Sequence, residues 1–566
     1  MYKWRLEIEK YKDLILDKIE KNKTVIIKGP TGCGKTTYLP LLLKDKKVAI
    51  IQPRRISVYA LYESLKSHLP NVGYKMRFEQ IKVDRNKPHT MIFTDGAFLM
   101  NFDLEYDFVI VDEVHERSER IDVLLILLNK YFKNKLILMS ATLETVELEK
   151  YFSAKTIEIK CKTNKLKRIY LEKPTADYIT TSFLKIKEIL QKKENVDGRR
   201  DILVFLPTVE DINELSKNLK RIVGCNVHKV YSQMSEEKQR MIFEKTPGIK
   251  IILSTNICET SLTIPSVKYV IDSGLVKNKV FDGISYFGIQ KISSESEKQR
   301  EGRCNRTGEG VCYKMYTKDT KFYNSSPTFS RIDVSSVFLF CVYYKINILT
   351  CEFLSYPTVK GCKYALENLC EKGCIEICEK QNNINIKITN HGKKMILLPF
   401  ELDLAHFYEL SCREGCGYFA TVFVTLASLE NYNFLMLKEK DKINDIEYMV
   451  FVFEEYVKAK DKEFFCKQFE LPIKGMSIAF KIFSGMKNKM TKGGIDDFLR
   501  LFSKCFSYNK CVRQTDGSYI HEKTGRKVWI HPSSTFFKRK VQKIVCVNFF
   551  CTSKAYCRIV GQFYGI

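Results

Sequence analysis

The chain has 566 residues, and at roughly 150 residues per domain this length predicts three to four domains rather than one core. Hydrophobic residues make up 45% and charged residues 28%, a globular composition that excludes a disordered tail or a fibre. The longest apolar runs, such as 337–344, are far shorter than the roughly 20 residues that span a bilayer, and the charged start MYKWRLEIEK lacks the apolar segment of a signal peptide. We therefore expect a protein that stays inside the cell, with no membrane contact.

Positive charge dominates the composition, because 93 Lys and Arg stand against 66 Asp and Glu and leave a net charge of +27. A surplus of this size is either solvated or matched by a polyanion, so nucleic acid is the leading partner. The alternative is a lysine-rich composition that raises surface charge everywhere without a binding role. Motifs have to decide between the two.

The 20 cysteines are scattered along the chain, and no C-x-x-C pair occurs. Cys370, Cys374 and Cys378 are spaced by four residues but have no nearby His. We therefore expect reduced and mostly buried thiols rather than disulfides or a zinc site.

Short β-branched runs alternate with amphipathic stretches from Thr24 onward, in the order TVIIK, VAII, MIFT, FVIV and LILM. This alternation predicts a parallel α/β sheet. The charged segment 191–201, QKKENVDGRRD, lacks apolar periodicity and is interpreted as a linker. A second α/β series follows, with ILVFL, IKIILS and YVIDSG as strands, so we expect two similar sheets in tandem with a cleft between them.

Beyond about Tyr316 the pattern becomes helical and stays so to about Lys504. Short strands follow, separated by the turn sequences 515–517 (TDG) and 523–525 (KTG). The C-terminal part is therefore expected to be accessory to the two sheets.

A phosphate-binding loop is predicted where the strand TVIIK runs into GPTGCGKT, the pattern G-x-x-x-x-G-K-T between Gly29 and Thr36. Backbone N–H groups and a helix N-terminus face the anion in such a loop, while Lys35 reaches the outer phosphates. The Thr36 hydroxyl is then placed to bind Mg²⁺. The alternative, a glycine-rich turn without function, is disfavoured by the strand-loop-helix context.

The strand FVIV ends in Asp112-Glu113-Val114-His115. Asp112 stands where a P-loop enzyme needs a carboxylate for Mg²⁺, and Glu113 suits the general base that activates water for hydrolysis of a γ-phosphate. A solvated acidic turn would have the same letters, but the motif gains weight from its distance downstream of the phosphate loop.

The segment 299–306, QREGRCNR, places Arg300, Arg303 and Arg306 at a spacing of three. At least two guanidinium groups can then point in one direction, across a cleft, and neutralise charge on a leaving phosphoryl group. The alternative is a solvated basic helix face.

Together these motifs resemble those of the DEAH-box RNA helicases, superfamily 2 ATPases with two RecA-like domains. One such motif can arise by chance, but the chain has eight in the order of the family. They are GPTGCGKTT (29–37), QPRRISV (52–58), VGYKMRFE (72–79), TDGAFL (94–99), DEVHER (112–117), SAT (140–142), STNICETSLTIPSVKYVIDSG (254–274) and QREGRCNR (299–306).

The resemblance implies a site for ATP, with other nucleoside triphosphates open, and for Mg²⁺. It assigns Mg²⁺ to Thr36 and Asp112, the catalytic water to Glu113 and Gln299, and the role of arginine fingers to Arg303 and Arg306. The catalytic set also includes Lys35. The implied nucleotide-binding residues are Gly29, Thr31, Gly32, Gly34, Lys35, Thr36, Thr37, Asp112, Phe243 and Thr263.

The resemblance also implies an RNA track and a coupling device. Ser140 and Thr142 would couple hydrolysis to domain movement, and His115 would connect the nucleotide site to the second domain. The RNA-binding residues would contact backbone or sugar and so grip RNA without regard to sequence. They are Arg55, Arg77 and Thr94 in the first domain, and Thr255 and Asn256 in the second.

Several positions depart from the family pattern. Val114 replaces the usual Ala, Asn305 replaces a Gly, and the loop 205–210 differs from the usual FLTGQEE. Pro265 stands where an Asp is common near the nucleotide, and Ser64 stands where an Arg would stack on the base, which leaves Phe243 for the other side of the base.

The resemblance extends past the motor and predicts five domains in a chain with little sequence before its motor, like a minimal member of the family. The expected fold class is α/β, with two tandem RecA-like parallel-sheet domains followed by winged-helix, helical ratchet-like and OB-fold-like domains. The expected bounds are 1–165, 166–325, 326–398, 399–504 and 505–566.

The motifs leave three functions open. The first is an ATP-driven RNA helicase that moves 3′ to 5′ on single strands, and the second is a translocase that remodels RNA–protein particles with weak duplex unwinding. The third, a catalytically dead RNA-binding scaffold, is disfavoured because a scaffold needs no water-activating carboxylate such as Glu113.

The resemblance also implies work in pre-mRNA splicing or ribosome assembly, on single-stranded RNA, RNA duplexes or RNA–protein particles. A glycine-rich (G-patch) activator protein is an expected partner, the chain is expected to be a monomer, and the expected location is the nucleus or otherwise the cytoplasm.

A β-hairpin is predicted between the last two motor motifs, with Asp282-Gly283 as its turn. The family places a hairpin here that can split a duplex. Tyr286 and Phe287 either stack on a base at the junction or pack under the hairpin.

Overall fold

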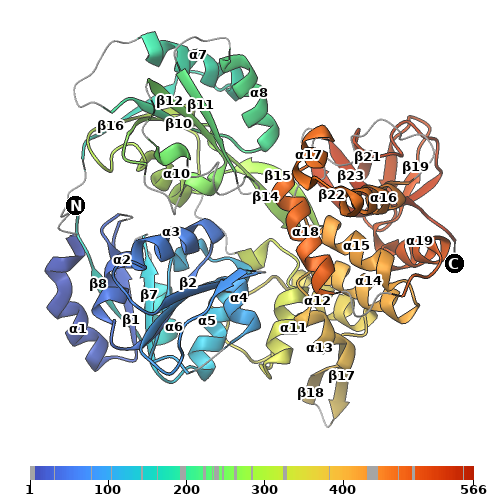
Figure 1. Cartoon of the computed structure of the whole chain (residues 1–566), viewed down its shortest axis with the longest axis horizontal. Helices are drawn as coiled ribbons and strands as arrows, with labels where there is room; N and C mark the ends of the chain where they lie inside the picture. The colour runs from blue at the N-terminus through green and yellow to red at the C-terminus, as the bar shows by residue number, and fades with distance from the viewer. Residues whose placement is uncertain are drawn as a thin grey trace. The chain divides into compact units, whose positions relative to one another are not determined.

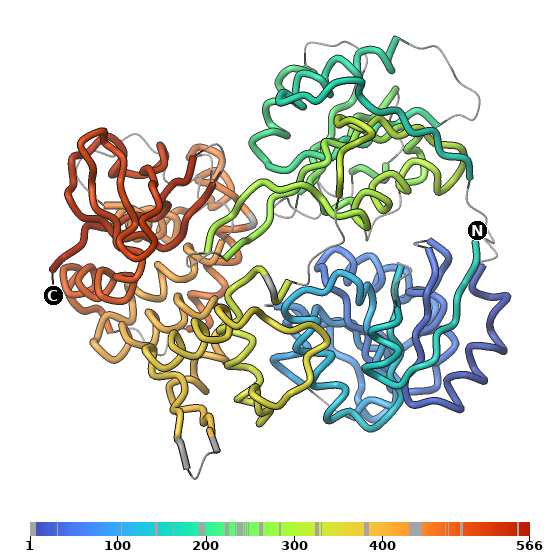
Figure 2. Tube along the Cα trace, turned by 180° about the vertical axis from the view of Figure 1, so that it is seen from behind, coloured from blue at the N-terminus to red at the C-terminus, as the bar shows by residue number. Residues whose placement is uncertain are grey.

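The computed structural model (Figures 1 and 2) divides the chain into two compact units. The first comprises 1–277, 290–328 and 352–355, and the second comprises 278–289, 329–351 and 356–566. The structure describes residues 7–30, 32–77, 79–102, 105–141, 145–161, 164–191, 199–220, 225–231, 234, 241–244, 246, 248–259, 264–281, 285–322, 328–380, 383–429, 444–469, 471–486, 491–551 and 554–565.

The first unit begins with an eight-stranded sheet of order β4-β3-β5-β2-β6-β7-β1-β8, parallel except for the antiparallel pair β3–β4. The strands are the β-branched runs identified in the sequence, and β1, β2, β5 and β6 are almost entirely buried, as expected for strands covered on both faces. Their bounds are β1 Thr24–Lys28, β2 Lys47–Gln52, β3 Val72–Met76, β4 Glu79–Ile81, β5 His89–Thr94, β6 Phe108–Val111, β7 Lys135–Ser140 and β8 Lys155–Glu158.

Helices on one face of this sheet share a core with the strands through Ile15, Leu39 and Leu61, from α1, α2 and α3. The helix α5 buries a run of eight consecutive side chains from Ile121 to Leu128. The helical bounds are η1 Glu7–Tyr11, α1 Lys12–Lys21, α2 Lys35–Leu42, α3 Arg55–Leu65, α4 Asp95–Met100, η2 Val114–Glu116, α5 Glu119–Tyr131 and α6 Val146–Phe152.

A second parallel sheet has the order β11-β12-β10-β13-β16-β9 and a hydrophobic cluster on each face, one of them formed with α7 and α8. Figure 1 shows α7 and α8 together beside this sheet. The bounds are β9 Leu166–Leu171, α7 Tyr178–Gln191, β10 Asp201–Phe205, α8 Val209–Leu219, β11 Cys225–Val230, η3 Met241–Phe243, β12 Ile249–Ser254, η4 Asn256–Cys258, β13 Val267–Asp272, α10 Ser294–Glu301 and β16 Gly310–Thr317.

The charged segment 191–201 does not separate the two sheet domains. The segment 191–201 was expected to be a linker that precedes the second α/β series, but β9, which lies before it, pairs with β16 inside the second sheet. The segment therefore connects α7 to β10 within one domain, and its residues 192–198 lie outside the described part of the chain.

The second unit combines helices with a mostly antiparallel sheet of order β14-β15-β22-β19-β20-β21-β23 and a two-stranded ribbon, β17–β18. The expected change from helices to strands near Lys504 is confirmed, since α19 ends at Cys505 and β19 begins at Cys511. The bounds are η5 Thr328–Ser330, α11 Ser335–Tyr343, α12 Val359–Glu371, β17 Ile375–Lys380, β18 Asn383–Ile388, α13 Asn390–Leu397, α14 Leu402–Arg413, α15 Gly417–Ala427, α16 Asp445–Lys458, α17 Lys462–Gln468, α18 Ile473–Gly485, α19 Ile495–Cys505, η8 Ser507–Asn509, β19 Cys511–Arg513, β20 Tyr519–His521, β21 Lys527–Ile530, β22 Lys543–Cys551 and β23 Ala555–Gln562.

An aromatic cluster forms the core of the helical part, where the ring of Phe407 lies 5.2 Å from that of Phe498 and 5.5 Å from that of Phe423. The two turns expected in the C-terminal strands are present, and Gly517 and Gly525 adopt φ values of +83° and +67°, which favour glycine. Among the described residues, no helix combines the length and the apolar character needed to cross a membrane.

The predicted hairpin corresponds to β14 (Leu275–Phe281) and β15 (Ser285–Lys291), which are neighbours in the sheet and lie side by side in Figures 1 and 2. Its turn, 282–284, lies outside the described residues. Tyr286 packs against the core of the third sheet, whereas Phe287 is 38% exposed. Of the two roles considered for this pair, packing under the hairpin is therefore the one that Tyr286 has.

Candidate active site

The loop between β1 and α2 requires glycine at two positions. Gly32 and Gly34 have φ values of +92° and +98°, which side chains rarely adopt, so these residues allow the tight turn into the helix. A Cβ on Gly29 would lie 3.0 Å from the Cβ of Ile159, so a side chain at position 29 would crowd Ile159, the residue that follows β8. The Lys35 ammonium donates to the carbonyl oxygens of Gly29 and Pro30, at 2.5 and 3.1 Å.

These contacts leave Lys35 buried inside the curve of the loop. The Thr37 hydroxyl donates to the Gly34 carbonyl at 3.3 Å, which stabilises the first turn of α2. Thr31 lies outside the described residues. A buried ammonium next to backbone carbonyls at a helix N-terminus is an arrangement suited to an anion.

Asp112 is the hub of the site. Its Oδ2 accepts hydrogen bonds from the Thr36 hydroxyl at 2.7 Å and from the Gln52 amide at 2.8 Å, and its Oδ1 accepts the N–H of Glu113 at 2.9 Å. Burial and the neighbouring Glu113 charge raise the pKa of Asp112 to about 6. The register Ile51↔Val111 between β2 and β6 explains why Gln52 and Asp112 meet.

Glu113 has a left-handed backbone with φ +53°, a conformation that costs on the order of 1–3 kcal/mol for a residue other than glycine and clusters at functional sites. Burial raises the pKa of its carboxyl, while the charges of Lys35 and Arg303 oppose that rise. Its Oε2 lies 3.4 Å from Nδ1 of His115, which accepts the N–H of Ala141 at 3.3 Å.

The second sheet contributes groups to the same place. Nε2 of His115 lies 2.8 Å from the side-chain amide of Gln299 on α10. Arg303 donates to the backbone oxygen of Glu259, and both Arg303 and Arg306 interact electrostatically with Glu113. Burial lowers the pKa of Arg303 to about 10 and also lowers that of Arg306.

Arg300 is directed elsewhere, although it shares the spacing of the other two arginines. Its side chain is 1% exposed, and it donates to Glu259 Oε2 at 3.0 Å and to Asp272 Oδ1 at 2.9 Å. Arg300 therefore stabilises the second sheet domain, and two guanidinium groups, not three, approach Glu113.

Two further residues in this region were not singled out from the sequence. Gln52 orients Asp112, as described above, and Arg54 donates to the carbonyl oxygens of Asn256 and Ile257 at 2.9 and 3.1 Å. These two hydrogen bonds link the two sheet domains, and an ion pair with Glu116 of the first domain, at 3.2 Å, helps to hold the Arg54 side chain. The sequence could have indicated both residues, because they lie in the motif QPRRISV.

The candidate RNA-binding residues follow the carboxyl ends of strands. Arg77 comes after β3, Thr94 ends β5, and Thr255 and Asn256 come after β12. Arg55, at the start of α3, donates to the Arg77 carbonyl at 3.0 Å and to Glu79 at 2.6 Å, so these two arginines lie together. Ligands of open α/β sheets bind at this edge.

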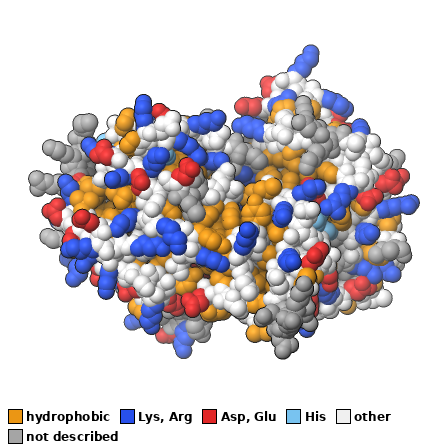
Figure 3. All heavy atoms as spheres, turned by 90° about the horizontal axis from the view of Figure 1, so that it is seen from below, with side chains coloured by type: hydrophobic (Ala, Val, Ile, Leu, Met, Phe, Trp, Pro, Cys, Tyr) orange, Lys and Arg blue, Asp and Glu red, His pale blue; other side chains and the backbone are white. Residues whose placement is uncertain are grey.

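The positive charge of the chain does not by itself mark an RNA surface. On the face shown in Figure 3, Lys and Arg side chains are distributed widely, with Asp and Glu among them.

The residues expected near the nucleotide base are only partly described. Phe243 ends η3, but the structure does not describe its side chain, and Thr263 lies outside the described residues. Ser64 lies exposed on α3, and Pro265 is exposed before β13.

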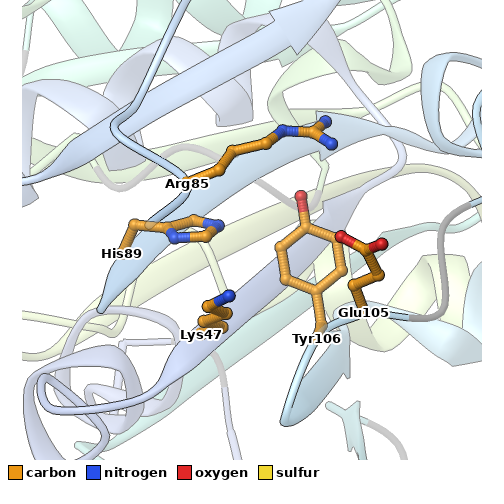
Figure 4. Close-up of a pocket in the computed structure, with 5 residues that line it drawn as sticks. All are labelled: Lys47, Arg85, His89, Glu105 and Tyr106. Carbon is orange, nitrogen blue, oxygen red and sulfur yellow. The ribbon is translucent and has the colours of Figure 1, made fainter. Parts of the chain in front are cut away.

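A small pocket lies at the opposite edge of the first sheet. Lys47 and His89 open β2 and β5 there, and Arg85, Glu105 and Tyr106 complete its wall (Figure 4). Its cavity of about 10 Å³ has room for roughly one water molecule, which is too small for a nucleotide.

Comparison with known proteins agrees with this geometry. Residues 10–150 match the DEAD/DEAH box helicase family, and residues 182–308 match the helicase conserved C-terminal domain. The chain is 32% identical to an ATP-dependent RNA helicase HrpA of Borreliella burgdorferi, across 99% of this chain and 74% of that protein. It is 27% identical to the ATP-dependent RNA helicase DHX33 of Mus musculus, across 98% and 87%, and 27% identical to the probable ATP-dependent RNA helicase DHR2 of Saccharomyces cerevisiae, across 98% and 86%.

The two family matches cover most of the two parallel sheets, and the phosphate loop, the Asp112–Glu113 pair and the arginines of the segment 299–306 all lie inside them. The chain therefore belongs to the DEAH-box family of superfamily 2, and it is an ATP-hydrolysing RNA helicase.

Proposed function

We propose that the nucleotide site is formed by both sheet domains of the first unit. The observation that carries this proposal is the 2.8 Å contact between Gln299 of the second sheet domain and His115, which follows the buried Glu113 of the first. The residues proposed to hold the nucleotide are Gly29, Thr31, Gly32, Gly34, Lys35, Thr36, Thr37, Asp112, Phe243 and Thr263.

Each catalytic group has a role suited to its surroundings. The Glu113 carboxylate would accept the proton of the attacking water, and the Gln299 amide would orient that water. Lys35 would turn from the loop carbonyls to the outer phosphates, while Arg303 and Arg306 would neutralise the charge that develops on the transferred group. Partial burial strengthens all of these electrostatic interactions.

The proposed metal is Mg²⁺, held by Thr36 and Asp112. A hydroxyl and a carboxylate 2.7 Å apart supply the hard oxygen ligands that Mg²⁺ prefers, with the phosphates and waters completing its shell. Among the described residues no group of three His, Cys, Asp or Glu could hold a metal by itself, which fits an ion bound jointly by protein and nucleotide. When bound, Mg²⁺ would neutralise phosphate charge.

We propose that RNA is held as a single strand by Arg55, Arg77, Thr94, Thr255 and Asn256, and that the motor moves 3′ to 5′. Contacts of this kind address phosphate and sugar, so the grip would be independent of sequence. The hairpin β14–β15 would split a duplex ahead of the strand. The direction of movement rests on the family resemblance.

The second unit is proposed to contain the accessory domains expected from the sequence. Its helices and ribbon over 326–398 suit a winged helix, its helices over 399–504 suit a ratchet-like domain, and its strands over 505–566 suit an OB-like fold. The motor domains would then span 1–165 and 166–325.

The cellular role proposed is remodelling of RNA–protein particles in pre-mRNA splicing or ribosome assembly. The protein would act as a monomer in the nucleus, or otherwise in the cytoplasm, with a G-patch activator. These points rest on the family resemblance, and a translocase that moves along RNA but opens duplexes weakly is the second candidate.

Unwinding of tailed duplexes tests the proposal. With ATP and Mg²⁺, the full chain should separate 3′-tailed RNA duplexes and leave blunt and 5′-tailed ones paired, while Lys35→Ala should separate none. Opening of 5′-tailed duplexes alone would reverse the proposed direction. Movement along single strands without opening of any duplex would favour the translocase.

A further inference from the structure

The second unit contains a basic cavity of about 630 Å³, within the range of small-ligand sites and large enough for a nucleotide. It lies between α12 and the turn that joins β20 to β21. We call it the basic cavity, and its charged and aromatic lining consists of Lys360, Lys363, Tyr364, Glu367, Lys523 and Arg526.

Positive charge prevails in the basic cavity, because four cationic side chains face one carboxylate. That carboxylate, Glu367, lies 3.9 Å from Lys363, and the two side chains are 59% and 78% exposed, so water and salt weaken their attraction. A surplus of about three charges therefore remains around one open cavity. Such a space attracts a polyanion.

Arg526 is held in position by an aromatic ring. Its guanidinium carbon lies 4.5 Å from the ring centroid of Tyr286 on β15, and Tyr286 is itself packed into the core opposite Phe549 of β22. A guanidinium fixed on a ring is a preorganised donor that matches the planar geometry of a phosphate.

Tyr364 is positioned by the other strand of the same hairpin. Its ring lies 4.6 Å from that of Phe281 on β14, and the Lys523 ammonium lies 5.8 Å from its centroid. The side chain is half-buried and lines the basic cavity. Cationic groups combined with aromatic side chains are typical of sites that bind single-stranded nucleic acid.

The turn that presents Lys523 and Arg526 is fixed by hydrogen bonds. The N–H of Gly525 donates to the His521 carbonyl and the N–H of His521 donates to the Arg526 carbonyl, both at 2.9 Å, while Nδ1 of His521 lies 2.8 Å from the Thr524 hydroxyl. A preformed turn loses little conformational freedom when it binds a ligand.

We propose that the basic cavity is a second RNA-binding site, separate from the motor track. Lys360, Lys363, Lys523 and Arg526 hold phosphodiester groups of a single strand, and one base lies against Tyr364. An acidic protein segment would satisfy the charges alone, but the aromatic wall, the stacked guanidinium and the nucleotide-sized space favour RNA. The inference rests on the proposed function in that it takes the chain to bind RNA.

Removal of three charges tests the site in the full chain. Affinity for an oligouridylate is measured by fluorescence anisotropy over a series of salt concentrations, for the wild type and for Lys360→Gln/Lys363→Gln/Lys523→Gln. Three exposed lysines elsewhere in the unit give the matched control, Lys387→Gln/Lys393→Gln/Lys504→Gln. The slope of log affinity against log salt should become shallower by about 2 in the cavity variant, at about 0.7 per phosphate contact on a single strand, and stay unchanged in the control.

Crosslinking gives a second measurement that does not depend on the stability of the variant. RNA that carries 4-thiouridine should attach to peptides containing 360–367 or 523–526 of the wild type. Equal slopes for the two triple variants would overturn the proposal. So would the absence of RNA crosslinks at 360–367 and 523–526 if polyglutamate binds to the wild type and not to the cavity variant. Loss of all RNA binding by the wild type would instead refute the proposed function, and with it this inference.

Discussion

Nε2 of His115 and the side-chain amide of Gln299 lie 2.8 Å apart, and this contact joins the motif after β6 to α10, the helix that precedes Arg303 and Arg306. His115 also accepts the N–H of Ala141, just after β7. One imidazole therefore touches three segments that belong to two domains, a position suited to transmit the state of the nucleotide.

His115→Ala should uncouple RNA from hydrolysis. Nucleotide affinity should stay close to that of the wild type, because the phosphate loop is unchanged, while RNA-stimulated turnover should fall about 5- to 100-fold, the equivalent of about 1–3 kcal/mol for a buried polar contact. Steady-state ATPase rates with and without RNA measure this. His68→Ala, at an exposed histidine, is the control, and equal stimulation in both variants would contradict the coupling role.

Glu113→Gln and Arg303→Ala should bind nucleotide and hydrolyse it poorly. The Thr36–Asp112 contact and the phosphate loop survive in both variants, but the first loses the proton acceptor and the second a positive charge near it. Single-turnover hydrolysis should slow by about 10²- to 10⁴-fold and by about 10³-fold, respectively. Arg500→Ala removes an exposed arginine from α19 as a control. Near-normal turnover in both site variants would refute the mechanism.

The Asp112 carboxyl should give nucleotide binding a pH dependence. Burial and Glu113 raise its pKa to about 6, so the folded chain binds a proton at pH values where the unfolded chain has lost it. This carboxyl therefore contributes stability at low pH that is lost as the pH rises through about 6. Binding of Mg²⁺ and nucleotide needs the ionised carboxyl, so the affinity should rise with pH where the stability contribution falls.

Affinity for a fluorescent nucleotide with Mg²⁺ should be constant near pH 8 and fall as the pH drops below about 6. Asp112→Asn should bind more weakly at every pH and show a flatter profile. Equal affinities of the wild type at about pH 5 and about pH 8 would show that Asp112 is not the group that titrates.

Much of the motor could be predicted because its signals are local. The run TVIIK followed by G-x-x-x-x-G-K-T determines both β1 and the loop, and the buried run FVIV places Asp112 at the end of β6. The segment 191–201 was misinterpreted because a charged stretch without periodicity has the same appearance between two domains and between a helix and a strand of one domain.

Side-chain direction depended on contacts that are distant in sequence. Arg300 and Arg303 stand three residues apart, yet Arg300 turns into the core because its partners Asp272 and Glu259 lie 28 and 41 residues away. Gln52 reaches Asp112 across a parallel strand pair, which only the register of the sheet reveals.

A buried carboxylate should stabilise the second unit. Asp445, at the start of α16, accepts hydrogen bonds from the Ser534 hydroxyl at 2.7 Å and from the N–H groups of Thr535 and Val560 at 2.6 and 2.7 Å. Ser534 belongs to the sequence HPSS and is itself buried.

Asp445→Ala should lower the free energy of unfolding by about 2–4 kcal/mol, because three buried donors lose their acceptor. Asp496→Ala, at an exposed carboxylate in the first turn of α19, should change it by less than about 0.5 kcal/mol. Thermal unfolding followed by circular dichroism compares the two, and similar midpoints would show that the three hydrogen bonds are replaced by water.

Nucleotide selectivity should be loose, because two positions that read base or sugar in the family are changed. Ser64 lies exposed on α3 where an Arg would stack, and Pro265 is exposed, with its carbonyl accepting a 2.7 Å hydrogen bond from the Thr307 hydroxyl. With phosphate contacts left to dominate, GTP, CTP and UTP should support hydrolysis within roughly an order of magnitude of ATP, since one lost contact is worth about 1 kcal/mol. Ser64→Arg should shift the ratio of kcat/KM values toward ATP, while Ser67→Arg, at an exposed position just after α3, should leave it unchanged. A strict requirement for ATP by the wild type would mean that other side chains read the base.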